Sequence, residues 1–163
     1  MDKGVRTSIV RLPPINHGAG DDHGFIAQMV AKAREEGVSA YVNDGRNVWP
    51  ASSRLDVSWA YVLALEKGKA GSVFRESRSS RLRCEMLTVV ADAVAEQGIP
   101  IRDIATSIGK QLDVPAVSKT QEEASKSFGF LAWVLGLNNP TSSLMTREML
   151  GWDPVSACAA RRY

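Results

Sequence analysis

The residues best suited to ligand chemistry lie in the segment NDGRNVWPASSRLD. Arg46 and Arg54 could hold a phosphate or carboxylate through paired hydrogen bonds, and Trp49 could stack on a flat ligand. Ser53 adds a hydroxyl beside Arg54. The same residue types also suit a structural role, with Trp49 in the core, Asp56 capping a helix and Arg54 paired with a surface acid. Residue types alone leave both interpretations open.

The two histidines, His17 and His23, lie in a loop that contains GAGDDHG. The loop follows a predicted strand and precedes a predicted helix, which is the setting of a dinucleotide-phosphate loop. We reject dinucleotide binding here because the glycine spacing differs and because Asp21 and Asp22 would repel a pyrophosphate. The histidines have no Cys or Glu pair at ligand spacing, so no metal site is predicted. His17 follows a strand, where α/β proteins bind ligands, and a structural role for it stays equally open.

Catalytic motifs are absent from the sequence. Neither Tyr41 nor Tyr61 has a lysine four positions later, so there is no Tyr-x-x-x-Lys pair, and there is no P-loop or nucleophile elbow. Cys84 and Cys158 do not form a spaced set. The run RESRSSRLR (75–83) could be a phosphorylation site or a nucleic-acid contact, but a net charge of +2 favours a solvated loop and no nucleic-acid partner. We therefore assign no catalytic residue and no metal ligand.

Hydrophobic periodicity indicates which elements position these residues. Strands mix with helices in the first half and helices dominate the second, which indicates an α/β or α+β class. The predicted strands are 6–12, 39–42 and 71–74. The predicted helices are 25–37, 56–67, 101–112, 120–128, 131–137 and 142–150.

The composition is that of an ordinary globular chain. It has 163 residues, of which 44% are apolar and 23% charged, and this length suits one domain. No apolar stretch is long enough to span a bilayer, and nothing resembles a signal peptide. We expect a reduced, soluble, cytoplasmic protein with no membrane partner.

Five stretches, in order along the chain, resemble the NAD-dependent epimerase/dehydratase family of extended and atypical short-chain dehydrogenases. They are GVRTSIVRLPPINHGAGDDHGF, AREEGVSAYVNDGRNVWPASSRLD, ALEKGKAGSVF, AVAEQGIPIRDIATSIGKQLDVP and NNPTSSLMTREMLGWDP. The resemblance implies an α/β class, here an incomplete Rossmann-type fold with late strands and a mostly helical carboxy-terminal region on the substrate side. It implies that full-length relatives bind NAD or NADP and a small-molecule substrate, and it is compatible with a homo-oligomer.

The resemblance also places two groups of residues at the site. The group that would border the nicotinamide end of the cofactor is Pro13, Pro14, Ile15 and His17. The group that would border the substrate is Arg46, Trp49, Ser53 and Arg54. Arg54 would be the anion or hydrogen-bond anchor, whereas Ser53 departs from the histidine of the family pattern. The family's glycine-rich loop and Tyr/Lys pair would precede Gly4 and are absent, so we expect this chain alone to bind no cofactor.

Residues 75–92 are unlike the family, whose pattern runs from Phe74 through one histidine to Ala93. We hypothesise a retained intron that interrupts this histidine codon. An intron that begins with the donor GTGAGT and ends with the acceptor GCAG would, when translated, encode Arg-Glu-Ser at its start and Ala-Asp at its end. These are the two ends of the segment. The alternative is a genuine inserted helix. The dipeptide at 155–156 can likewise be read through a donor site, GTAAGT.

The chain thus divides into four predicted segments. They are a late Rossmann strand with its loop and substrate-side segment (1–74), the foreign insert (75–92), a helical substrate-binding region (93–154) and a divergent tail (155–163). The predicted function is a fragment of an NAD(P)-dependent oxidoreductase or epimerase acting on a small hydroxy or keto compound, inactive alone. The alternative is a non-catalytic binding or oligomerisation module. Because the strand at 6–12 should be an inner strand without its neighbours, we expect exposed apolar surface and low solubility.

Overall fold

The structure is a computed structural model that describes residues 7–68 and 88–156. Its strands are β1 (Thr7–Arg11), β2 (Ile15–His17), β3 (Ser39–Val42), β4 (Val48–Ser53), β5 (Thr88–Asp92), β6 (Glu96–Pro100) and β7 (Ala116–Lys119). Its helices are α1 (Phe25–Glu36), α2 (Arg54–Lys67), α3 (Ile101–Leu112), α4 (Gln121–Phe128), α5 (Phe130–Leu135) and α6 (Leu144–Leu150). The α/β class predicted from the sequence is confirmed. The second half is less helical than expected, since β5, β6 and β7 lie in it.

The described strands form three small sheets. Strands β1 and β5 pair in parallel, as do β3 and β7. Strand β4 pairs in parallel with β2 and antiparallel with β6. The β4–β6 register is irregular between Trp49 and Ala51, where Pro50 has no N–H to donate. The proline within β4 and the short length of β2 explain why the sequence pattern predicted neither β4 nor β2.

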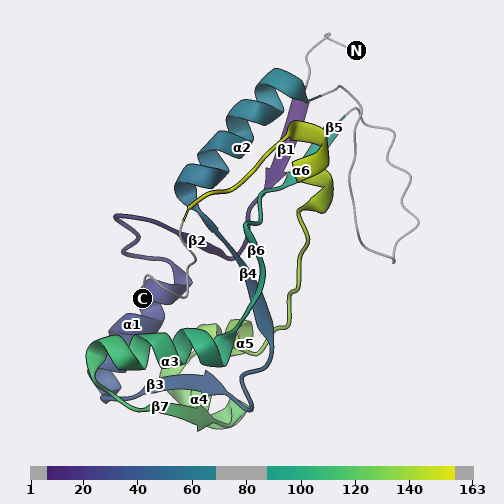
Figure 1. The fold of residues 1–163 in the computed structure, drawn as a ribbon. Coiled ribbons are helices and arrows are strands. Elements are labelled where there is room, and N and C mark those ends of the chain that lie inside the picture. Colours follow the sequence, from purple (N-terminus) through teal and green to yellow (C-terminus); the bar gives the residue numbers. More distant parts are fainter. Residues whose placement is uncertain (1–6, 69–87, 157–163) are drawn as a thin grey trace, which may run out of the picture.

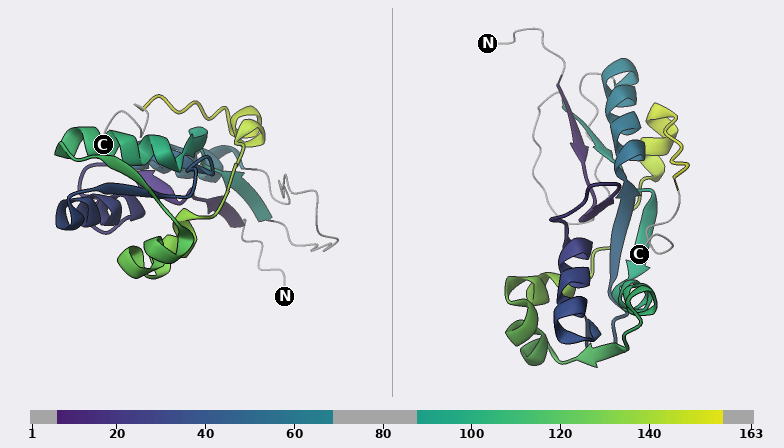
Figure 2. Two further views of the ribbon diagram at one scale, coloured as in Figure 1. Left: turned by 90° about the horizontal axis from the view of Figure 1, so that it is seen from below. Right: turned by 90° about the vertical axis from the view of Figure 1, so that its left-hand side faces the viewer.

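The elements gather at two ends of an elongated molecule, with β4 and β6 running between them (Figures 1 and 2). At one end α2 and α6 pack on β1 and β5, around a small core that includes Val57, Leu63 and Trp152. At the other end α1, α3, α4 and α5 surround β3 and β7, over a larger core that includes Trp49 and Ile104. Each end therefore has its own apolar cluster.

Local sequence signals account for most helix ends. Helix α1 ends at Gly37, whose φ of 68° is left-handed and suits glycine. Helix α4 begins with a full capping box, in which Thr120 accepts from the Glu123 N–H and Glu123 accepts from the Thr120 N–H. Helix α2 corrects the prediction, because its N-cap is Ser53 and Asp56 lies in its first turn. The serine hydroxyl accepts from Leu55 N, so the N-cap lies three residues earlier than expected.

Strand β1 confirms the predicted strand over Thr7–Arg11, but it is not fully buried. Ile9 is 52% exposed and Leu12 is 42% exposed. The predicted strand at 71–74 and residues 75–87 lie outside the described residues. The alternative prediction of an inserted helix in 75–92 is wrong over Thr88–Asp92, because these residues form β5. Within the described part of the chain, no helix is long and apolar enough to cross a membrane.

Candidate functional site

A polar cavity of 490 Å³ lies at the carboxyl ends of β1 and β5. This is the edge of a parallel sheet where α/β proteins bind ligands. Strand and loop residues from four parts of the chain line it: Arg11, Leu12, Pro13, Pro14, Pro50, Asp92, Val94, Gln97, Asn139, Pro140, Thr141 and Ser142. We call it the proline cavity. Its walls combine flat proline faces with carboxamide and hydroxyl groups.

An ion pair forms one wall of the proline cavity. Arg11 and Asp92 are partners in the β1–β5 register, and the arginine donates to both carboxylate oxygens, from Nε and from Nη2 at 2.8 Å. The Asp92 side chain is 12% exposed and that of Arg11 is 53% exposed. The pair is neutral overall, so the cavity offers donors and acceptors without a net charge. Sequence analysis missed this pair because Asp92 belongs to the segment that resembles no family pattern.

The backbone on the far side of the proline cavity is pinned to the central strands. The Asn139 N–H donates to Val48 O at 2.9 Å, and the Thr141 N–H donates to Gln97 O at 3.1 Å. Since these contacts use main-chain groups, they leave the Gln97 side chain available at the cavity wall, whereas Asn139 Oδ1 accepts a hydrogen bond from Thr141 Oγ1 at 3.5 Å. Gln97 and Asn139 both lie in stretches that resemble the family, but the sequence did not single them out as site residues.

The four residues expected at the cofactor end separate into two pairs. Pro13 and Pro14 line the proline cavity. Ile15 and His17 instead lie in β2 and are 2% and 1% exposed, paired in register with Ala51 and Ser53. Both residues are therefore buried beside β4 and do not line the proline cavity.

Arg54 lies over the glycine-rich loop that follows β2. A Cβ atom at Gly18 would be 2.9 Å from Cγ and Cδ of Arg54, and one at Gly20 would be 3.9 Å from its Nη1. Glycine at position 18 therefore makes room for the arginine stem. Among the described residues, no carboxylate is paired with the Arg54 guanidinium, which leaves it able to bind an anion.

The other three residues expected at the substrate, like Arg54, do not line the proline cavity. Ser53 is buried and caps α2. Trp49 is 1% exposed, donates from Nε1 to Leu137 O at 3.1 Å and meets Phe25 edge-on at 5.4 Å. Its ring is thus part of the core and offers no free face for stacking. Arg46 lies before β4 and Arg54 after it, so about 20 Å of strand separates them.

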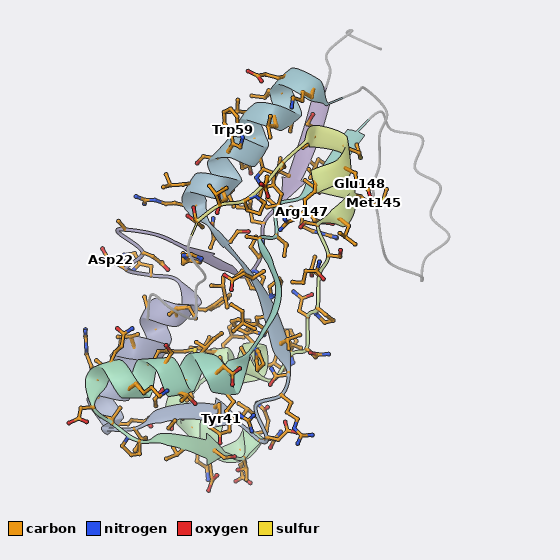
Figure 3. The ribbon with its side chains drawn as sticks, in the orientation of Figure 1. Asp22, Tyr41, Trp59, Met145, Arg147 and Glu148 are labelled. Carbon is orange, nitrogen blue, oxygen red and sulfur yellow. The ribbon has the colours of Figure 1, made fainter. Side chains whose placement is uncertain are left out.

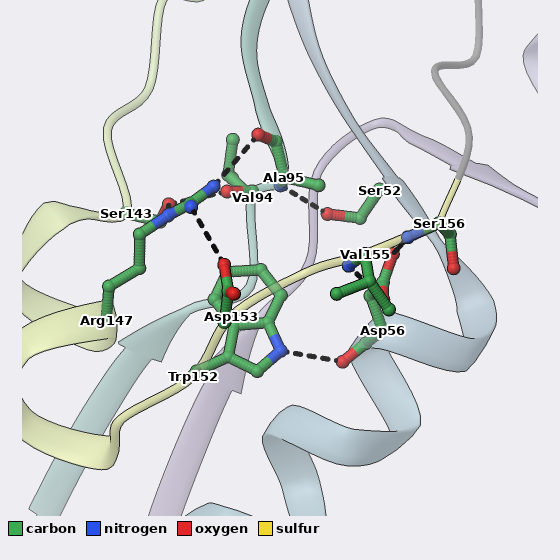
Figure 4. A network of polar contacts seen from close by, with 10 residues as sticks. All are labelled: Ser52, Asp56, Val94, Ala95, Ser143, Arg147, Trp152, Asp153, Val155 and Ser156. Carbon is green, nitrogen blue, oxygen red and sulfur yellow. Dashed lines mark hydrogen bonds and ion pairs between the residues drawn. The ribbon is translucent and has the colours of Figure 1, made fainter.

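Asp56 has a structural role that the sequence only partly predicted. It is 5% exposed, and its carboxylate accepts from the N–H groups of Val155 at 3.1 Å and Ser156 at 3.2 Å (Figure 4). Its own carbonyl accepts from Nε1 of Trp152 at 2.9 Å. These contacts fasten the segment after α6 to the first turn of α2.

The described residues do not fit the pyrophosphate of a dinucleotide. The one glycine-rich loop before a helix is closed by Asp21, whose Oδ1 accepts from Gly24 N at 2.9 Å. A carboxylate thus occupies the position at the α1 N-terminus where a phosphate would bind. This contact supports our rejection of that loop as a dinucleotide site. The described residues also contain no cluster of three His, Cys, Asp or Glu side chains that could hold a metal ion.

Two curated relatives align with nearly the whole chain. The uncharacterized protein C2A9.02 of Schizosaccharomyces pombe is 48% identical over 152 residues, which is 93% of this chain and 45% of the relative. The uncharacterized protein YLL056C of Saccharomyces cerevisiae is 41% identical over 153 residues, 94% of this chain and 45% of the relative. The chain therefore spans about half the length of the curated relatives it matches. No protein-family model matches it.

Solved structures show the fold. The dTDP-glucose 4,6-dehydratase DesIV of Streptomyces venezuelae, with NAD and TYD bound, gives a TM-score of 0.61 at 16% identity, covering 97% of this chain and 42% of that one. The UDP-glucose 4-epimerase of Thermotoga maritima, with UDP-glucose, also gives 0.61, at 18% identity, 94% of this chain and 42% of that one. The chain thus has a fold like part of the Rossmann-type epimerases and dehydratases, as the sequence predicted. At these identities the likeness shows the fold alone.

Proposed function

We propose that this chain is the substrate-side part of an NAD(P)-dependent oxidoreductase or epimerase that acts on a small hydroxy or keto compound. The observation that carries the proposal is the proline cavity at the carboxyl ends of the parallel strands β1 and β5. Ligands of α/β proteins bind at this edge. The fold likeness to epimerases and dehydratases supports the reaction class.

The chemistry of the cavity suits a neutral ligand rich in oxygen. The Arg11 guanidinium donates, the Asp92 carboxylate accepts, and the carboxamides of Gln97 and Asn139 do both. A hydroxyl or keto oxygen can be oriented by such a set without burying an unpaired charge. Pro13 and Pro14 would border the cofactor, and Arg54, which does not line the cavity, would be an anion or hydrogen-bond anchor for a part of the substrate outside it.

The chain alone should neither bind nor use a dinucleotide. The loop at the α1 N-terminus is closed by Asp21, and no Tyr-x-x-x-Lys pair is present in the sequence. The cofactor and the acid–base pair would be supplied by another part of the enzyme, as in the full-length family. The alternative, a non-catalytic binding or oligomerisation module, is not favoured because the solved structures with a similar fold are epimerases and dehydratases.

A chimera tests the proposal. In it, this chain replaces the matched segment of the fission-yeast relative C2A9.02, which supplies the remaining length. We expect the chimera to bind NADH or NADPH, detected by fluorescence of the reduced cofactor, and to oxidise it with a small aldehyde or ketone from a panel. The isolated chain is the control and should bind neither cofactor by calorimetry. A folded chimera that binds neither NADH nor NADPH, or an isolated chain that binds either at micromolar affinity, would overturn the proposal.

A further inference from the structure

A second cavity lies between helices α1 and α3 and has a volume of 490 Å³. None of the residues that line it lines the proline cavity, so the two are separate. We call it the α1–α3 groove. Its walls combine an apolar floor with a few polar side chains, and its volume lies within the range of small-ligand sites in proteins.

Two helix stripes form the floor of the groove. On α1 the stripe is Ala27, Val30 and Ala31, which share one side of the helix because they are three and four residues apart. On α3 it is Ile108 and Leu112, one turn apart. The two alanines leave a hollow that larger side chains would fill, since the atoms of a well-packed helix pair otherwise interdigitate. The floor can therefore bury narrow apolar groups.

The two ends of the groove carry opposite charges. Asp21 and Asp22 lie in the loop that precedes α1, and Figure 3 labels Asp22 there. Arg34 lies in the last turn of α1, ten residues beyond the Gly24 N-cap. The two ends are thus about 15 Å apart along the helix axis. Long side chains on a helix lean toward its N-terminus, so the arginine side chain shortens this distance.

The cation at the lower end of the groove is not neutralised by its neighbours. Glu35 pairs with Lys32, and Glu36 pairs with Lys119. In the described part of the chain, Arg34 takes part in no ion pair and no side-chain hydrogen bond. Its guanidinium is therefore able to bind a carboxylate of a ligand through two hydrogen bonds.

The acidic end of the groove also has acceptors to spare. Asp21 uses Oδ1 to accept from Gly24 N at 2.9 Å, which leaves Oδ2 for a further donor. Asp22 is exposed, and within residues 7–68 and 88–156 it has no ion pair and no hydrogen bond through its side chain. These two carboxylates speak against a phosphate at this loop and favour an ammonium group.

We propose that the α1–α3 groove binds a short apolar peptide with free termini. The peptide's α-ammonium lies at Asp21 and Asp22, and its α-carboxylate lies at Arg34. An extended peptide advances about 3.4 Å per residue, so four residues span about 14 Å, close to the separation of the two charged ends. Gln111 lines the groove between them, and its carboxamide can donate to and accept from a peptide group.

The charge pattern favours this occupant over other apolar ligands. A fatty acid has no cation for Asp22, and an alkylamine has no anion for Arg34. A helix of a partner protein would present neither free terminus. The site goes beyond the proposed function, because it uses no residue of the proline cavity and requires no cofactor.

Calorimetry with a matched peptide series tests the site. The probe is the tetrapeptide Leu-Ala-Ala-Leu with free termini, titrated into the full 163-residue chain and into the chimera. We expect 1:1 binding with a Kd of about 0.1 mM. Acetylating the amino terminus, or amidating the carboxy terminus, should each weaken binding about fivefold, because each removes one charge from its partner. Octanoate and octylamine, which carry one charge each, should bind more weakly than the free peptide.

Substitutions at the groove assign each end of the peptide. Arg34→Met should weaken the free peptide about fivefold and remove the difference between the acid and the amide. Asp22→Asn should reduce the difference between the free and the acetylated peptide in the same way. Ala31→Leu should weaken every peptide about tenfold, because the larger side chain fills the floor. All three residues are exposed and helix α1 tolerates leucine well, so the fold should be kept.

Arg102→Met and Asp103→Asn are the matched controls. Both residues are exposed in the first turn of α3 and neither lines the groove. They should leave the affinity within about twofold. Absence of binding at about 5 mM peptide would overturn the proposal. Equal binding of the free, acetylated and amidated peptides, octanoate or octylamine binding as tightly as the peptide, or equal weakening by Arg102→Met and Arg34→Met would overturn it too.

Discussion

Replacing Asp56 with asparagine should destabilise the fold through one defined set of contacts. Both carboxylate oxygens of Asp56 accept backbone N–H groups, from Val155 and Ser156, and the side chain is nearly inaccessible to water (Figure 4). Asparagine keeps one acceptor oxygen and turns the other into an NH₂ donor that faces an N–H. One partly buried N–H donor then loses its charged acceptor, which costs about 1–3 kcal/mol.

A second contribution comes from charge. Asp56 lies in the first turn of α2, where a negative charge stabilises a helix by about 0.3–1 kcal/mol. Together the two effects predict a loss of about 1–4 kcal/mol in the free energy of unfolding. The hydrogen bond from Trp152 to the Asp56 carbonyl should survive, because it uses the main chain.

Urea unfolding of the chimera, followed by circular dichroism and tryptophan fluorescence, measures this loss. Asp153→Asn is the control, because the Asp153 side chain is 85% exposed and its one ion pair, with Arg147, is long at 3.9 Å. That substitution should change the free energy of unfolding by less than about 0.5 kcal/mol. A loss below about 0.5 kcal/mol for Asp56→Asn, or equal losses for both variants, would refute the reasoning.

Three further predictions concern acid stability, the anion anchor and the transcript. The pKa of Glu36 lies below its ordinary value of 4.5 because Lys119 donates a hydrogen bond to its carboxylate. The pair therefore stabilises the fold fully above pH 4.5, and this contribution is lost as the pH falls through the lowered pKa. Lys119→Met should flatten this part of the acid-unfolding curve, and an unchanged slope would contradict it. Arg54→Met should raise the KM of the chimera about tenfold. Arg46→Met, at a side chain that is 80% exposed, should change the KM by less than about twofold. Similar effects of the two substitutions on the KM would contradict the role of Arg54 as the anchor. The mature transcript should lack the codons for 75–92, and a spliced message that retains them would remove the intron hypothesis.

Sequence reasoning predicted the elements whose signals are local. The capping box at Thr120 and the apolar face of α3 each depend on residues within a turn or two, so these helices were predicted with good boundaries. Strands β2 and β4 were missed because their stability comes from pairing with each other rather than from their own composition. Pro50 and the polar Ser52 argue against a strand locally, yet the Ser52 hydroxyl donates to Ala93 O at 2.6 Å. Only the tertiary partner makes that serine suitable for a buried strand.

The candidate site shows the same division. Motif order directed attention to the loop after β1, and Pro13 and Pro14 do line a cavity there. Whether a residue next to a motif faces a ligand or the core depends on strand register, which a single sequence does not give. Trp49 and His17 therefore lie inside the protein, while Gln97 and Asn139, which were not predicted as site residues, lie at the cavity.

Strand β5 shows that the segment without family resemblance still contributes to the parallel sheet. Two short runs in the sequence favour a strand before Ala93, GSVF ahead of the insert and TVVAD at its end. The structure pairs the second run with β1, so its last residue, Asp92, stands opposite Arg11. If the intron hypothesis holds, the spliced protein would have a histidine in place of Asp92 and Arg11 would lose its carboxylate partner. The proline cavity would then present an unpaired guanidinium and would favour an anionic substrate over a neutral one. The nature of the 75–92 segment thus decides the charge of the candidate substrate, which links the genetic question to the chemical one.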